Sequence, residues 1–162
     1  MLMYKWTFVA IIVLFISCGG EKNKPDVSGI NVDVTLQRFE QDFFKIDSTD
    51  LVPSLANLQH KYPKFYPVFM QDILQLPPQG EKAFPIVTTI LGSYRSLNDS
   101  LQKKYPRLDW LEEELESNFR YVKYYYPSYQ LPNIITFIGT LDVPGAVLTP
   151  THLGIGLHQY AG

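Results

Sequence analysis

The sequence predicts an α+β fold, in which a layer of short, aromatic-rich helices and one long helix accompany a small, incomplete β-sheet. Three observations support this prediction. Apolar residues alternate with polar ones over residues 31–39, which is the period of a half-buried strand. They then recur every three or four residues over most of the chain, as in helices. β-branched residues and glycines become frequent near the end, where further strands are expected.

The first 17 residues have the parts of a secretory signal peptide. Lys5 precedes an unbroken apolar run that continues to Ile16, and the small residue Ser17 follows the run. A transmembrane helix needs about 20 apolar residues, so this run is too short to span a bilayer comfortably. We therefore expect residues 1–17 to be removed during export.

The single cysteine, Cys18, directly follows this signal. Phe15-Ile16-Ser17-Cys18 resembles a bacterial lipobox, whose cysteine is lipidated and becomes the new N-terminus, although Phe15 stands where leucine is usual. Several lipid tails on one residue would hold a protein stably on a membrane. We predict that Cys18 is the lipidation site, so that the membrane is a partner and the folded part faces the periplasm. The alternatives are an ordinary secreted protein and an uncleaved apolar anchor.

Residues 18–29 are the predicted lipidated tether. They are polar and rich in glycine, lysine and proline, so they cannot bury enough surface to fold and should form a flexible linker. Without the signal peptide, 13 basic residues remain against 16 acidic ones. Nucleic-acid-binding domains present a basic face, so we expect no nucleic-acid partner. The length of residues 30–162 suits one α+β domain.

The folded part begins with a strand and continues into short helices. Residues 31–39 predict the half-buried strand, and four apolar residues after it predict a turn of helix or an aromatic plug. Helical spacing begins again at Leu51, after several possible N-caps. Pro63 and Pro67 are expected to divide the next stretch into short helices. Residues 83–91 and 94–104 predict two more helices, with a kink at Gly92-Ser93. The four apolar residues are Phe39, Phe43, Phe44 and Ile46.

The longest predicted helix follows Pro106 and stops at Pro127. An apolar stripe, expected to face inward, runs along it, and acidic residues fill its first turns. The acidic run could be a metal or acid–base site, but matching of the helix dipole and solvation explain it without chemistry. Tyr124-Tyr125-Tyr126 could be a binding platform, but burial of one or two of these rings is favoured. The stripe consists of Leu108, Leu111, Leu115, Phe119, Val122 and Tyr126.

The last part predicts strands. Residues 133–139 are apolar and β-branched, Asp142-Val143-Pro144-Gly145 predicts a turn, and residues 146–149 are expected to pair back. Residues 154–160 predict another strand, thinned by glycines where a backbone or ligand approaches. Because no capping helix follows, we expect the domain to be truncated at its C-terminus. The strands at 134–139 and 154–160 are then expected at or near a sheet edge.

The chain shows no pattern typical of an active site. Its histidines are His60, His152 and His158, and none has a His or Glu partner at ligand spacing, whereas zinc needs three or four ligands. There is no Gly-x-Ser-x-Gly elbow and no P-loop in the sequence. We therefore expect no enzyme, no cofactor, and no catalytic or metal residue. Two alternatives stay open: a zinc-peptidase-like enzyme with its active site in missing sequence, and a lipid-anchored ligand-binding module.

A set of segments, taken in order, resembles the gliding-motility lipoproteins of the GldB type from the Bacteroidota. The chain departs from the family at His158 and at Tyr160-Ala161-Gly162, where an acidic residue and Tyr-Leu-Gly are usual, and family members continue further. The segments are the lipobox and tether, Pro25–Ile30, Arg38-Phe39-Glu40-Gln41-Asp42-Phe43-Phe44, Leu58–Pro63, Tyr121–Pro127 and Gly154-Ile155-Gly156-Leu157.

The resemblance implies a membrane-anchored lipoprotein component of the cell envelope. Its expected partners are other proteins of the gliding machinery and of the related secretion apparatus. Members of the family need not glide, so a role in general envelope maintenance stays open. No molecular activity is implied residue by residue.

Overall fold

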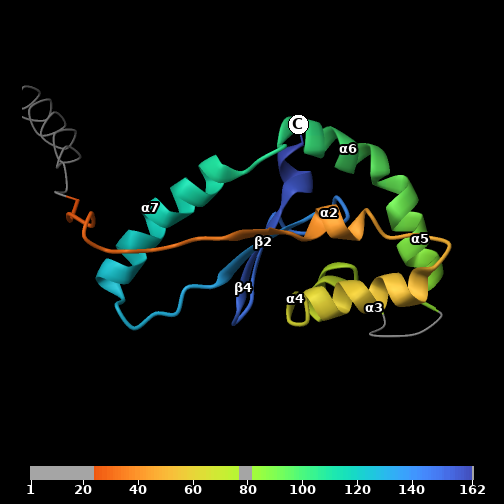
Figure 1. Cartoon of the computed structure of the whole chain (residues 1–162), viewed down its shortest axis with the longest axis horizontal. Helices are drawn as coiled ribbons and strands as arrows, with labels where there is room; N and C mark the ends of the chain where they lie inside the picture. Colours follow the sequence, from red (N-terminus) through yellow and green to blue (C-terminus); the bar gives the residue numbers. More distant parts are fainter. Residues whose placement is uncertain (1–23, 77–81, 162) are drawn as a thin grey trace, which may run out of the picture.

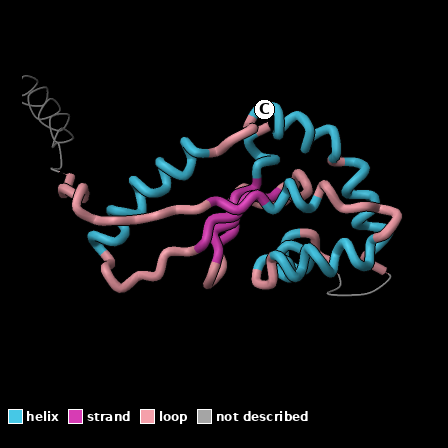
Figure 2. Tube along the Cα trace, in the orientation of Figure 1, coloured by secondary structure: helices cyan, strands magenta, loops and turns pink. Residues whose placement is uncertain are grey.

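The computed structural model describes residues 24–76 and 82–161, and these residues form the predicted α+β fold (Figures 1 and 2). The predicted signal peptide and the lipidation site Cys18 lie outside the described residues. The described end of the tether contains a turn, in which the Ile30 N–H donates to the Val27 carbonyl at 3.0 Å. The domain boundaries at 17/18 and 29/30 stay predictions.

The sheet has four strands in the order β1-β2-β4-β3. Strands β1 (Leu36–Arg38), β2 (Asn133–Phe137) and β4 (His152–Gly156) are parallel to one another, and β3 (Ala146–Leu148) is antiparallel to β4. Residues 146–148 thus form a strand, but the expectation that they pair back across the turn is wrong, because β3 pairs with the strand that follows it, β4, and not with β2. The last two predicted strands were expected at or near an edge, and neither is itself an edge strand, because β2 and β4 are the two central strands of the described sheet, each next to an edge strand. Hydrogen-bonded neighbours on both sides support these strands.

The predicted first strand is shorter than its sequence pattern. Burial alternates as expected from residue 31 onward, with Val32 and Val34 buried between exposed neighbours. Only Leu36–Arg38 pair with β2, however, in a register that places Leu36 beside Ile134. The alternation in the sequence indicates which side chains face the core. Backbone hydrogen bonding as a strand also requires a neighbouring strand, and only Leu36–Arg38 have one.

The first helical layer contains three α-helices, α2 (Phe39–Phe43), α3 (Leu51–Lys61) and α4 (Phe65–Pro67). The backbone continues from α4 through Pro67 into the π-helix η1 (Val68–Ile73), with φ −61° and ψ −43° at Pro67. The expected break at Pro67 is therefore wrong. Proline is tolerated there because it lies in the first helical turn, whose N–H groups need no helical partner.

The second helical pair is α5 (Phe84–Ser93) and α6 (Arg95–Lys104). They are separated at Tyr94, one residue after the predicted kink, where the backbone leaves helical geometry. At the end of the chain, β4 stops at Gly156, and residues Leu157–Tyr160 form the 3₁₀-helix η2. The predicted strand at 154–160 is thus a strand only over its first three residues.

The helical layer packs on one face of the sheet through aromatic rings. Phe39 lies 4.6 Å from Phe69 and 5.1 Å from Phe65, measured between ring centroids, and Phe69 contacts Phe137 of β2 at 6.2 Å. The glycines of β4 make room for this layer, because a Cβ on Gly154 would lie 3.2 Å from the Phe137 ring. The glycines of β4 therefore accommodate aromatic rings of the protein itself, and not a ligand.

The long helix α7 (Asp109–Tyr125) covers the other face of the sheet. Its apolar stripe faces inward as predicted up to Val122, and Leu115 and Phe119 pack against a small cluster of Val32, Val34 and Ile134, but the last residue of the stripe, Tyr126, is exposed. No residue of α7 is fully buried, however. Tyr124, Tyr125 and Tyr126 are all exposed, so the expected burial of one or two of them is wrong. None of the described helices is both long and apolar enough to cross a membrane.

Candidate functional site

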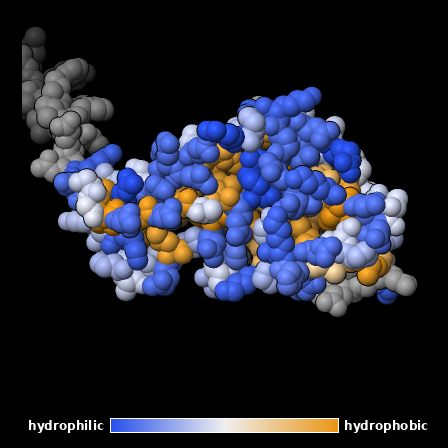
Figure 3. Space-filling view, viewed as in Figure 1, coloured by the Kyte–Doolittle hydropathy of each residue, from blue (hydrophilic) through white to orange (hydrophobic). Residues whose placement is uncertain are grey.

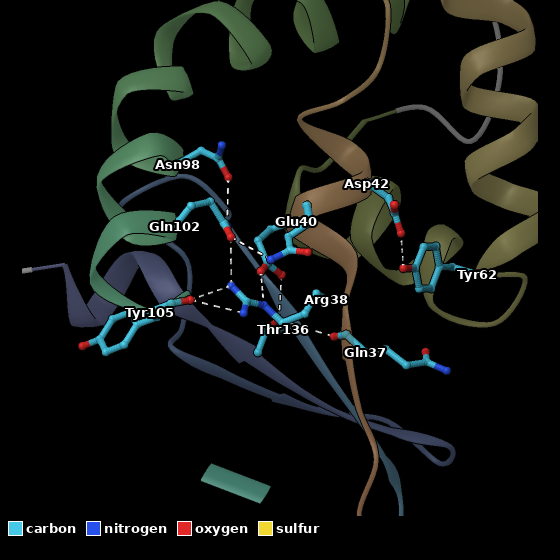
Figure 4. Close-up of polar contacts among 10 residues, drawn as sticks. Gln37, Arg38, Glu40, Asp42, Tyr62, Asn98, Gln102, Tyr105 and Thr136 are labelled. Atoms are coloured by element: carbon cyan, nitrogen blue, oxygen red, sulfur yellow. Dashed lines mark hydrogen bonds and ion pairs between the residues drawn. The ribbon is translucent and has the colours of Figure 1, made fainter. Parts of the chain in front are cut away.

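Two charged residues of the Arg38–Phe44 segment, Arg38 and Glu40, meet at the carboxyl end of β1 (Figure 4). Arg38 Nε donates to Glu40 Oε1 at 2.5 Å, and Thr136 Oγ1 donates to Glu40 Oε2 at 2.6 Å. The Glu40 side chain is fully buried and that of Arg38 is 16% exposed. A buried carboxylate is tolerated when it is paired and hydrogen-bonded. This contact therefore fixes α2 against β2.

The same guanidinium also reaches α6. Both terminal nitrogens of Arg38 donate to the Tyr105 carbonyl at 3.3 Å, and Nη2 donates to Gln102 Oε1 at 3.1 Å. The last carbonyls of a helix lack helical partners and carry partial negative charge. Arg38 satisfies one of them, while Gln41 Nε2 donates to Gln102 Oε1 at 2.8 Å. The cluster thus joins β1, α2, β2 and α6.

A second polar contact from this segment holds α3. Asp42 Oδ2 accepts hydrogen bonds from Tyr62 Oη at 2.5 Å and from Lys61 Nζ at 2.6 Å. Burial alone would raise the pKa of Asp42, but these two donors outweigh it and lower that pKa below its ordinary value. Burial, and then the Asp42 carboxylate, raise the pKa of Tyr62. Asp42 is therefore an acceptor that holds α3, with its proton lost at neutral pH.

Sequence reasoning did not single out Arg38 and Glu40 as a cluster, although a signal for it was present. Arg38 follows Val32, Val34 and Leu36 at the same period of two. A charge in the buried register of a strand needs a buried partner of opposite sign. Glu40 is that partner.

Two carboxylates of α7, Glu112 from the acidic run in its first turns and Glu116 after that run, have a structural role. Glu112 Oε1 accepts a hydrogen bond from the Leu36 N–H at 2.8 Å, and Glu116 Oε1 accepts one from the Val34 N–H at 3.2 Å. Residues four apart lie on one face of a helix, and N–H groups two apart lie on one edge of a strand. The helix therefore covers the outer edge of β1. Matching of the helix dipole, by which the acidic residues were explained from the sequence, does not predict this contact.

An apolar groove lies between the first turns of α7 and strands β3 and β4. Its volume is about 250 Å³. Trp110 and Leu111 of α7 form one wall, and Leu153 and Ile155 of β4 line its base. The Trp110 side chain is 57% exposed, and Leu148 of β3, on the same face of the sheet, is 66% exposed. The other residues that line the groove are Tyr105, Leu108, Gly145, Ala146, Leu157 and Tyr160.

Apolar surface is exposed near α7 as well as elsewhere. Figure 3 shows hydrophobic side chains, in orange, in the half of the molecule where α7 and the N-terminal segment lie, and further ones over the helical layer. The face of β4 that α7 leaves partly uncovered carries Leu153 and Ile155, each half-buried. Contiguous exposed apolar surface marks a contact site more often than scattered single residues do. The groove is therefore the candidate interaction site.

The histidines do not come together. His158 is buried, with Nδ1 accepting from the Gly139 N–H at 3.2 Å and Nε2 lying 3.3 Å from the Val143 carbonyl. The nearest polar partner of His152 is Thr151 Oγ1, 2.9 Å from its Nδ1. Burial lowers the pKa of both rings. Within residues 24–76 and 82–161, no three His, Cys, Asp or Glu side chains are grouped so that they could hold a metal ion.

The family was determined by comparison with known protein families. The family model described as gliding motility protein GldB matches residues 20–162. The chain belongs to the GldB family. Searches of the curated proteins and of the solved structures found no match. GldB membership identifies a lipoprotein associated with gliding motility, and the description of the family names no catalytic activity.

Proposed function

We propose that this GldB-family chain is a lipid-anchored component of the gliding-motility machinery in the cell envelope, working with the related secretion apparatus. Cys18 carries the lipid, and the folded domain lies in the periplasm. The family match supports the association with gliding, and the lipobox at Phe15–Cys18 supports the anchor. The domain acts by binding an apolar segment of another machinery protein in the groove of α7, β3 and β4.

The groove is the observation that carries the binding role. Its apolar lining gives affinity by removing Trp110, Leu153 and Ile155 from water. Strand β3 is an edge strand of the described sheet, so a partner segment lying along it gains main-chain hydrogen bonds as well. The volume of about 250 Å³ is below the roughly 300–1,000 Å³ typical of small-molecule pockets. These features favour a protein segment over a small ligand.

The anchor is tested by replacing Cys18 with serine in cells. The serine hydroxyl cannot receive the diacylglycerol, so Cys18→Ser should abolish uptake of radioactive fatty acid and leave the precursor uncleaved or outside its normal membrane fraction. A Cys18→Ser protein that takes up label and stays in the membrane fraction contradicts the anchor.

The groove is tested by complementing a strain that lacks the gene. The double variant Trp110→Glu, Leu148→Glu should stop gliding, because Trp110 lines the groove and Leu148 is paired with Leu153, which lines it. Both side chains are exposed enough to be replaced without unfolding the domain. Val52→Glu is the matched control, since Val52 is 63% exposed on α3. Normal gliding by the double variant, at normal abundance, contradicts a binding role for the groove.

A further inference from the structure

The last turn of α7 presents a cluster of tyrosines to solvent. Four tyrosines lie within six residues, and their exposed fractions range from 43% to 66%. The Tyr124 and Tyr125 rings pack edge to face, with 5.1 Å between their centroids. The tyrosine cluster, as we name it, consists of Tyr124, Tyr125, Tyr126 and Tyr129.

Backbone contacts fix the segment that carries these rings. Lys123 Nζ donates to the Pro127 carbonyl at 3.2 Å and to the Tyr129 carbonyl at 2.9 Å. The Tyr129 N–H donates to the Tyr126 carbonyl at 3.0 Å. The turn after α7 is therefore closed by its own hydrogen bonds, and it holds the rings outward.

The N-terminal segment runs alongside α7 in the opposite direction. Leu36 is bonded to Glu112 and Val34 to Glu116, one helical turn further along, and Ile30 packs in the same small cluster as Phe119. Continuing this order places the residues before Ile30 beside the last turns of α7. Figure 1 shows the N-terminal segment, in orange, reaching that end of the helix.

The predicted lipid anchor lies close to this end in the sequence. Cys18 precedes Lys24, the first described residue, by six residues. A fully extended chain spans at most about 3.6 Å per residue, so Lys24 lies within roughly 22 Å of the anchored residue. With Cys18 at the membrane surface, the end of the domain that carries the tyrosine cluster is the end nearest the bilayer.

We propose that the tyrosine cluster rests in the headgroup region of the membrane that holds the lipid on Cys18. This inference rests on the proposed lipid anchor. Tyrosine suits the position because its ring is apolar and its hydroxyl is polar, so it is enriched where bilayer and water meet. The helix rises about 1.5 Å per residue, so the groove at its other end stands away from the membrane. The contact orients the domain so that a partner can reach the groove.

A fluorescence experiment on vesicles tests the contact. The mature chain from Cys18 onward has one thiol, which can be coupled to a maleimide lipid in phosphatidylethanolamine–phosphatidylglycerol vesicles that contain brominated lipids. In a Trp110→Phe background, Tyr125→Trp places the single tryptophan in the cluster. Tyr160→Trp, at a position 53% exposed beside the groove, is the matched control.

We expect brominated lipids to quench the Tyr125→Trp protein several-fold more than the Tyr160→Trp protein. No quenching at either position, or equal quenching at both, overturns the contact. Tyr126→Trp gives a second probe of the cluster should Tyr125→Trp alter the circular dichroism spectrum. The coupling supplies the anchor chemically, so the outcome is independent of whether cells lipidate Cys18, and the fatty-acid labelling of Cys18→Ser reports on that separately.

Discussion

The two faces of the sheet are covered in different ways. On one face, phenylalanine rings from α4 and η1 pack against Phe137, a ring from α2 packs on them in turn, and all of these rings are almost completely buried. On the other face, α7 contributes only partly buried side chains, and it is held by hydrogen bonds from Glu112 and Glu116 to the edge of β1. The aromatic face therefore maintains the fold, whereas the α7 face keeps apolar surface available for contacts.

The largest effect is expected when the same truncation is made on each face. Phe137→Ala should lower the free energy of unfolding by about 3–5 kcal/mol, as for other fully buried phenylalanines. Phe119→Ala, on the half-buried stripe of α7, should cost roughly 1–2 kcal/mol because less apolar surface is lost. Urea unfolding followed by circular dichroism measures both. Equal losses would mean that the two faces are packed alike.

The next effect concerns the buried ion pair at the carboxyl end of β1. Arg38→Met should cost about 3 kcal/mol, because it leaves the Glu40 carboxylate buried without its cation. The double variant Arg38→Met, Glu40→Gln should recover part of that loss, since no buried charge remains. The two single variants and the double variant, unfolded in urea, form a double-mutant cycle. Additive losses would show that the two groups do not interact.

A smaller effect is expected at the contact between α7 and β1. Glu112→Ala should cost about 1 kcal/mol, because the Leu36 N–H loses its acceptor. Glu113→Ala is the control on the same helix, and its exposed side chain should change the stability by less than about 0.5 kcal/mol. The same urea titrations apply. A loss at Glu113 that matches the loss at Glu112 would mean that the helix is rotated from its described position.

The smallest effect is a dependence on pH that acts through the aromatic face. His152 packs on Phe65 and His158 on Phe137, and burial lowers the pKa of both below the ordinary 6.5. Below about pH 6.5 the two histidines take up protons in the unfolded chain but stay neutral in the folded chain. The free energy of unfolding therefore has its full value above pH 6.5 and decreases as the pH falls below it. The Asp42 carboxylate adds a loss only below its ordinary 3.8.

Unfolding in urea at pH 7.5 and pH 5.5 measures the histidine effect. His158→Asn should reduce the difference between the two pH values, whatever it does to the stability at pH 7.5. An unchanged difference would mean that His158 is protonated equally in the folded and unfolded chain.

Much of the fold could be predicted because local patterns determine it. Alternation identified which side chains near β1 face the core, and helical spacing located α3, α5, α6 and α7. The order of the strands could not be predicted, because pairing depends on contacts between residues about 100 positions apart, such as Leu36 with Ile134. The same limit explains why β2 and β4 were expected at or near an edge.

The candidate site was less predictable for two reasons. The groove is formed where α7 covers the sheet incompletely, and the stripe on α7 indicates which way the helix faces but not how closely it packs. Tyr124, Tyr125 and Tyr126 are exposed because the helix passes beyond the sheet after Val122, although the sequence pattern of the stripe continues to Tyr126. The charge at Arg38, in contrast, could have been recognised from its buried register.

The most direct test of the two-face comparison is photo-crosslinking in gliding cells. A photoreactive amino acid replaces either Trp110, which lines the groove, or Val52, which lies on the helical layer that covers the aromatic face. The two positions are matched, because each is the second residue of its helix and both side chains are well exposed. We expect the Trp110 position to form an adduct that mass spectrometry identifies as a gliding or secretion machinery protein, with none at Val52. Equal adducts at both positions, or none at Trp110, would contradict the assignment of binding to the α7 face.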